Sequence, residues 1–139
     1  CYANELTGLN LSGLTALKKL NCSINKFTSL NISGLTALQV LYCSNNYLTV
    51  LDLQGCTSLK ELDCYRNKLN AQAMTELLNA LPARAEKDYA KATLYTEYHT
   101  EGNHKDFTTA SEVRTAFEGA KKRNWKLQRK STNWKDVDI

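Results

Sequence analysis

The residues of this 139-residue sequence that could bind a metal or form a disulfide are, first of all, its five cysteines. Four of them recur at an interval of 21 residues, and the fifth lies outside that interval: Cys1, Cys22, Cys43, Cys64 and Cys56. Structural zinc sites use paired C-x-x-C spacing, which this sequence lacks. On stacked repeats about 4.8 Å apart the four side chains would point in parallel, which suits a disulfide poorly. We therefore predict buried free thiols at core positions.

The second candidate for chemistry is the polar stretch over residues 97–104, which contains both histidines. His99 and His104 flank Glu101, a set that could be drawn as a metal site or as an acid–base cluster. The stretch is typical of a strand end and a turn, where polar residues are common and nothing rigid holds such side chains together. The sequence also lacks a phosphate loop, a nucleophile elbow and an H-E-x-x-H motif. We expect no catalysis, no metal and no cofactor in this chain.

The elements that position these residues follow from the same interval, because leucine, asparagine and glycine also recur every 21 residues. The positions in register are Leu17, Leu38 and Leu59; Leu20, Leu41 and Leu62; Asn25, Asn46 and Asn67; Gly13, Gly34 and Gly55. A period in the twenties with the pattern L-x-x-L-x-C-x-x-N-x-L/F is the leucine-rich-repeat pattern. The sequence predicts an α/β leucine-rich-repeat solenoid, a right-handed β/α superhelix with a parallel sheet on its concave face, with repeats over residues 1–69.

Each part of the repeat has a physical reason. The segment L-x-x-L-x-C alternates apolar and polar residues, which predicts a short strand with one buried face. The asparagine after each strand, including Asn4, can satisfy backbone groups in stacked turns. Because 21 residues are too few for a helix opposite the strand, we expect extended or 3₁₀ return segments with glycine at the corner. Cys1 lies within a repeat, so we expect preceding repeats to cover that apolar end; a lipoprotein cysteine is the alternative.

Residues 70–139 depart from this register and predict α/β capping units of the same solenoid. The expected elements are a helix over 70–81, with Asn70 as its N-cap and Pro82 at its end, a strand over 91–98, a helix over 109–124 and a strand over 125–129. A tail follows through Trp134. We expect Trp125 and Trp134 to cover the last repeat. No run of apolar residues approaches the roughly 20 needed to span a bilayer.

The predicted binding surface is the concave sheet, where residues between the buried positions face outward. The predicted ligand-binding residues are Tyr2, Lys19, Asn21, Val40, Tyr42, Glu61, Asp63 and Tyr65. Aromatic residues are favoured at interface centres, which directs attention to Tyr42 and Tyr65. The alternative interpretation is that these are ordinary exposed strand residues, since tyrosine forms strands well.

The net charge of +4 comes with a basic C-terminal end, made of Lys121, Lys122, Arg123, Lys126, Arg129, Lys130 and Lys135. Such a cluster could bind anionic polymers, or it could be a solvated face.

The repeat L-x-x-L-x-C-S-x-N-x-L/F-T-x-L resembles the short repeats of internalin-like bacterial surface proteins, in the cysteine-containing variety of exported proteins from Gram-negative anaerobes. The segments Glu101-Gly-Asn103 and Ala120-Lys-Lys-Arg-Asn-Trp125 resemble the closing part of such proteins. The resemblance implies an extracellular, cell-surface or periplasmic protein that binds a protein or glycan ligand. The helical N-terminal cap and the immunoglobulin-like domain of internalins are not visible. The alternatives are a non-catalytic accessory domain of a larger enzyme and a basic surface for anionic polymers. We do not expect nucleic acid as a partner, and we expect a monomer.

Overall fold

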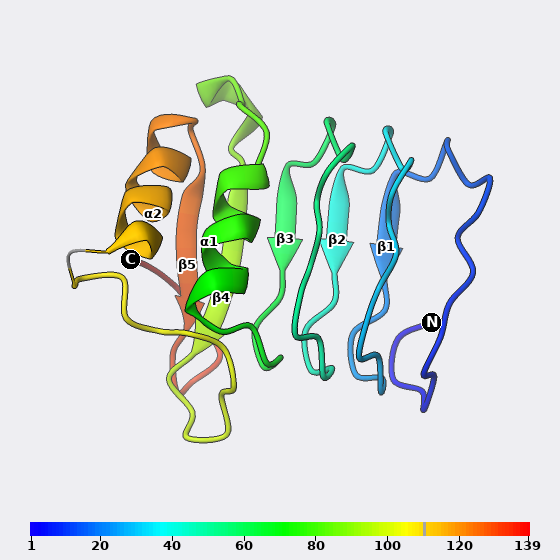
Figure 1. The fold of residues 1–139 in the computed structure, drawn as a ribbon, viewed down its shortest axis with the longest axis horizontal. Coiled ribbons are helices and arrows are strands. Elements are labelled where there is room, and N and C mark those ends of the chain that lie inside the picture. The colour runs from blue at the N-terminus through cyan, green and yellow to red at the C-terminus, as the bar shows by residue number, and fades with distance from the viewer. Residues whose placement is uncertain (110) are drawn as a thin grey trace.

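One six-stranded sheet runs the length of the molecule, in the order β1-β2-β3-β4-β5-β6 (Figure 1). The computed structural model describes residues 1–109 and 111–139. The strands are β1 (Lys19–Asn21), β2 (Val40–Tyr42), β3 (Glu61–Asp63), β4 (Lys91–Thr96), β5 (Lys126–Lys130) and β6 (Asp136–Asp138). Neighbours from β1 to β5 are parallel, whereas β6 is antiparallel to β5. The helices α1 (Ala71–Ala80) and α2 (Glu112–Lys122) lie on one face of the C-terminal strands, in front of them in Figure 1, and a 3₁₀ turn, η1 (Glu86–Asp88), precedes β4.

The strand register follows the 21-residue interval, as the sequence predicted. Leu20 pairs with Leu41, and Leu41 with Leu62, and all three side chains are buried. The return segments are tight turns: Leu35 N–H donates to the Ile32 carbonyl and Leu38 N–H to the Leu35 carbonyl. Gly34 adopts a φ of +81° there, in the left-handed region that glycine enters without steric cost. Each 21-residue turn of the chain is called a rung below.

The second half begins with the predicted helix. The Asn70 side chain accepts the Ala73 N–H at 2.9 Å, and α1 ends just before Pro82. The helix α2 begins at Glu112, later than the predicted residue 109, because Ser111 is its N-cap and the Asp106 carboxylate binds Thr108 and Thr109 in a turn. Residue 110, inside the predicted helix, lies outside the described residues. Among the described residues no helix is long and apolar enough to cross a membrane.

The C-terminal end differs from the sequence prediction at Trp134 and in the tail, but not at Trp125. Trp125 is buried, with its indole N–H donating to the Pro82 carbonyl at 2.7 Å. Trp134, in contrast, does not cover the last rung, because its ring stacks on Tyr98 at a centroid distance of 4.9 Å. The predicted tail also forms β6, which hydrogen-bonds along the edge of β5.

An asparagine ladder runs through the turns that follow the strands. Asn25, Asn46 and Asn67 each donate to carbonyls of their own rung and of the preceding one, and each accepts a main-chain N–H from the preceding rung. These three confirm the predicted role. Asn4 is exposed and its amide contacts only the Tyr2 carbonyl within the described structure.

The ladder continues at Asn103, which the sequence analysis did not identify. Its amide donates to the Cys64 and Leu94 carbonyls, both at 2.8 Å, and its carbonyl oxygen accepts the Leu69 N–H at 3.0 Å. Beside it, the Glu101 carboxylate accepts the N–H groups of Arg66, Thr96 and Asn103. The segment Glu101-Gly102-Asn103 therefore joins the short rungs to the larger helical units.

Candidate binding surface

The predicted concave residues of β1 to β3 lie on one face of the sheet and are exposed or partly exposed, while Tyr2 is exposed at the N-terminal end. Around Tyr42 they form a network. The Tyr42 hydroxyl donates to Glu61 at 2.8 Å, and Lys91 forms an ion pair with the same carboxylate at 2.9 Å. Lys19 Nζ lies 5.3 Å from the centre of the Tyr42 ring. The structure thus brings Lys19, Tyr42 and Glu61 together and adds Lys91, which the sequence analysis missed.

The two acids on this face, Glu61 and Asp63, have pKa values that are shifted in opposite directions. Burial is the largest influence on Glu61 and favours its neutral form, but hydrogen bonds from Lys91 and Tyr42 outweigh it and leave the pKa below the usual value. Burial raises the pKa of Asp63, against the opposing influence of Thr93 and Lys130. Burial and the bond to Glu61 raise the pKa of Tyr42 well above its ordinary value. The face therefore carries both signs of charge, and Glu61 and Lys91 are paired with each other.

Tyr65 belongs to a different group, which we call the aromatic corner: Tyr65, Tyr98, Trp134 and Arg66. The Trp134 ring centre lies 4.9 Å from that of Tyr98 and 6.3 Å from that of Tyr65. The Arg66 guanidinium lies 5.8 Å from the Trp134 ring centre. Trp134 remains 47% exposed and has a φ of +62°, an unusual value for a bulky residue. Tyr65 thus belongs to a different group from Tyr42. The sequence analysis did not identify Tyr98, Trp134 and Arg66 as part of a binding surface.

Comparison with known proteins agrees with this architecture. A family model described as "Leucine Rich repeats (2 copies)" matches residues 36–79. Among solved structures, the functional domain of InlJ from Listeria monocytogenes, described as including a cysteine ladder, is 30% identical, with a TM-score of 0.50 over 68% of this chain. The fold is a leucine-rich-repeat solenoid. The match spans 20% of the InlJ chain. No curated protein matches the sequence.

The solenoid has a cysteine ladder of its own. Cys22, Cys43 and Cys64 are fully buried on successive rungs, Cys56 is buried on the return side, and Cys1 is exposed. All five are free thiols, and Cys22, Cys43, Cys56 and Cys64 lie buried as predicted. The prediction was wrong for Cys1, which is exposed because it lies on the first rung of this structure and packs against a neighbouring rung on one side alone. Burial raises the pKa of Cys22 to about 11 and those of Cys43 and Cys64 well above their ordinary value.

We expect only Cys1 to react with a thiol reagent in the folded solenoid at neutral pH, because the reactive thiolate is disfavoured at the interior positions. A colorimetric thiol titration should give one fast equivalent, and all five after unfolding in guanidinium. A Cys1→Ser variant should lose the fast equivalent. Fast labelling of Cys43 or Cys64 without unfolding would contradict the buried ladder.

The histidine stretch does not form a reactive cluster. Glu101 binds main-chain N–H groups, His99 is exposed, and His104 donates from Nε2 to the Asp106 carbonyl while packing edge-on to Phe107. Within residues 1–109 and 111–139 there is no group of three His, Cys, Asp or Glu side chains that could hold a metal.

Three of the seven bases at the C-terminal end form ion pairs among the described residues. Lys126, Arg129 and Lys130 form ion pairs with Asp138, Glu97 and Asp136, at 3.1, 2.8 and 2.7 Å. The Arg123 guanidinium donates to the Leu78 and Leu81 carbonyls at the end of α1. These bases therefore stabilise the C-terminal units and are spread over several elements.

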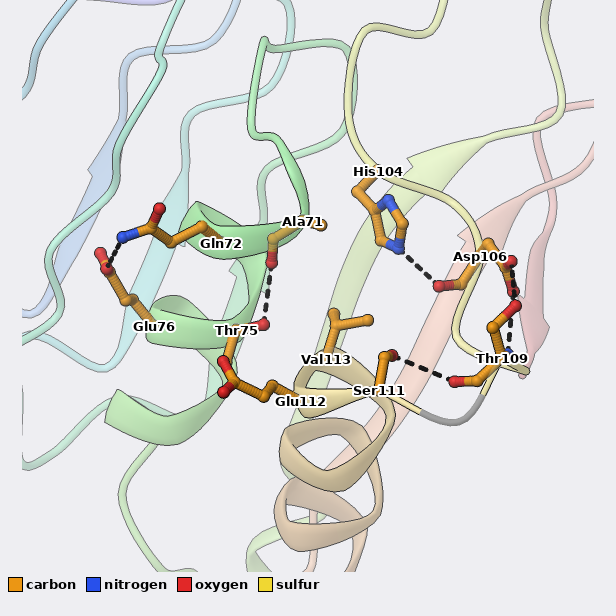
Figure 2. Close-up of a pocket in the computed structure, with 10 residues that line it drawn as sticks. All are labelled: Ala71, Gln72, Thr75, Glu76, His104, Asp106, Thr109, Ser111, Glu112 and Val113. Carbon is orange, nitrogen blue, oxygen red and sulfur yellow. Dashed lines mark hydrogen bonds between the residues drawn. The ribbon is translucent and has the colours of Figure 1, made fainter.

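A hollow of about 640 Å³ lies on the helical side, between the N-terminal ends of α1 and α2 (Figure 2). Its polar side chains are engaged with their neighbours: Gln72 donates to Glu76 at 3.1 Å, and Asp106 accepts from Thr109. Hydrogen bonds from Thr109 and Thr108 hold the pKa of Asp106 well below its usual range. The described lining of this hollow includes no phenylalanine, tyrosine or tryptophan, whereas Trp134 beside Tyr65 is 47% exposed.

Proposed function

We propose that this solenoid is a protein-binding module of an exported bacterial surface protein and that its ligand lies on the concave sheet. The observation that carries the proposal is the aromatic corner. Tryptophan, tyrosine and arginine are the residue types enriched where truncation costs most binding energy in protein interfaces. Here they converge from three separate segments, and Trp134 is held half-exposed in an unfavourable backbone conformation, a kind of strain that clusters at functional sites.

The surroundings of the corner support a protein ligand. The adjoining network of Lys19, Glu61 and Lys91 carries both signs of charge, which fits the polar rim of a protein interface better than a uniformly charged polymer. The resemblance of the repeats to those of internalin-like surface proteins supports export. Leucine-rich repeats bind proteins generally, which also favours a binding role over catalysis.

The test is capture from cell-surface protein extracts on immobilised wild-type solenoid, followed by affinity measurement with the purified partner. We expect Trp134→Ala to weaken binding by about 30-fold or more, as truncation of a central tryptophan typically costs at least about 2 kcal/mol.

The matched control is Tyr89→Ala, which removes another exposed aromatic ring, beside η1 and away from the corner. Circular dichroism should show both variants folded. If Trp134→Ala and Tyr65→Ala bind the partner as wild type does, the corner is not the binding centre.

A further inference from the structure

A second surface lies at the edge of the solenoid, where the turns after β1, β2 and β3 stand side by side (Figure 1). A groove of about 460 Å³ crosses these turns, and we call it the edge groove. One row of its lining consists of residues in the left-handed conformation, Ile24, Asn45 and Arg66, with φ of 56°, 55° and 54°. The other row consists of the residues that follow the ladder asparagines, Glu5, Lys26, Tyr47 and Lys68.

The backbone of these rows is already hydrogen-bonded. Lys26, Tyr47 and Lys68 donate their N–H groups to carbonyls of the preceding rung, each at 2.8 Å. The N–H groups of Ile24 and Asn45 donate to the following rung, each at 3.0 Å. A ligand in the edge groove would therefore be recognised by side chains and not by strand addition.

The side chains of the edge groove carry a surplus of positive charge. Lys68 Nζ lies 4.9 Å from the centre of the Tyr47 ring, and the Arg66 side chain contacts the Thr100 hydroxyl and the Trp134 ring. Within the described residues neither cation forms an ion pair with a carboxylate. On the concave face, by contrast, Lys91 and Lys130 are each paired within 2.9 Å.

The two acids near the groove offset this surplus only in part. Glu5 pairs with Lys26 at 3.2 Å, but its side chain is 84% exposed, and such an exposed pair is weak. Glu101 faces inward to three main-chain N–H groups. Between the cations, Tyr47 and Ile24 expose apolar surface, 47% and 43% respectively.

We propose that the edge groove binds an extended acidic peptide segment. Carboxylates would pair with Lys26 and Lys68, and an intervening side chain would pack on Tyr47 and Ile24. The two lysines are two rungs apart, about 10 Å at the spacing of neighbouring strands. Every second side chain of an extended peptide faces the same way, so residues i and i+4, about 13 Å apart, would present the carboxylates with residue i+2 between them, and the long lysine side chains can cover the difference. The edge groove shares Arg66 with the aromatic corner, but its other lining residues are different, and the proposal does not rest on the function proposed for the concave sheet.

The probe is fluorescein-labelled hexaglutamate, with hexaglutamine as the uncharged comparison, measured by fluorescence anisotropy at an ionic strength of about 0.15 M, where the screening length is about 8 Å. We expect the double variant Lys26→Ala/Lys68→Ala to weaken hexaglutamate binding about tenfold, since exposed ion pairs contribute up to about fivefold each. Tyr47→Ala should weaken binding about threefold through loss of the cation–aromatic contact.

The matched control is Lys87→Ala/Lys122→Ala, which removes the same charge from η1 and from the C-terminal end of α2, at the opposite ends of the strands (Figure 1). Binding by this control should stay within about twofold of wild type, because more distant exposed charges are screened. The proposal is overturned if the control loses as much affinity as the groove variant, if hexaglutamine binds as tightly as hexaglutamate, or if an oligothymidylate of equal charge binds more tightly.

Discussion

Replacing Asn46 by alanine is expected to lower the free energy of unfolding by about 3–5 kcal/mol, because several buried backbone groups would lose their partners at once. The Asn46 amide donates to the Cys22 and Cys43 carbonyls, each at 3.1 Å, and to the Ser44 carbonyl at 3.3 Å. Its carbonyl oxygen accepts the Phe27 N–H at 3.1 Å. These groups lie on two adjacent rungs, and a water that entered the space left by the amide would replace its bonds at the cost of being immobilised.

The matched control is Asn4→Ala, at the equivalent position of the first rung. Asn4 is exposed and its side chain bonds only to the Tyr2 carbonyl among the described residues, so loss of the side chain should change the free energy of unfolding by less than about 0.5 kcal/mol. Urea unfolding followed by circular dichroism gives both values. The denaturant slope must be compared as well, because rungs of a solenoid can unfold separately. Equal losses in the two variants would show that the buried ladder contributes little to stability.

The first half of the fold could be predicted closely because every rung repeats one set of contacts. Leu20 meets Leu41 and Leu41 meets Leu62 in the next rung, so periodicity alone fixes strand, register and buried face there. The helix α1 was equally predictable, since its N-cap Asn70 and the terminating Pro82 are local features. The start of α2 was predicted less well, because the turn held by Asp106 moves it to Glu112.

The candidate site was predicted only in part. Alternation along the strands places Lys19, Tyr42 and Glu61 on one face, but their use as a ligand surface stays a prediction. The aromatic corner depends on how far the β5–β6 turn carries Trp134 back over the sheet toward Tyr65. The position of Trp134 depends on tertiary structure and cannot be predicted from the 21-residue repeat. The role of Asn103 in the ladder was not predicted for a related reason. Asn103 follows Cys64 by 39 residues, whereas Asn67 follows the same cysteine by 3.

The second large effect on stability is expected at the junction formed by Glu101, Gly102 and Asn103. Gly102→Ala is expected to lower the free energy of unfolding by about 2–4 kcal/mol, because an added side chain would meet rigid backbone. A Cβ atom built on Gly102 would lie 2.1 Å from the Asn67 carbonyl oxygen, a distance that cannot persist without displacing the loop. Displacement would separate Asn103 from the Cys64 and Leu94 carbonyls and Glu101 from the Arg66 N–H.

Urea unfolding and amide hydrogen exchange at Arg66 and Leu69, the N–H groups held by Glu101 and Asn103, would measure this effect. Gly8→Ala is the control, since nothing lies within 4 Å of its added Cβ, and its stability should change by less than about 0.5 kcal/mol. Because Gly102→Ala and Asn103→Ala disrupt the same docking, their combined loss should fall short of the sum of the two by about 1 kcal/mol or more. If the two losses add fully, or if exchange at Leu69 is unchanged, Gly102→Ala does not act by displacing Asn103. The contact of Gly102 with the Asn67 carbonyl would then not be needed to hold Asn103 in the ladder.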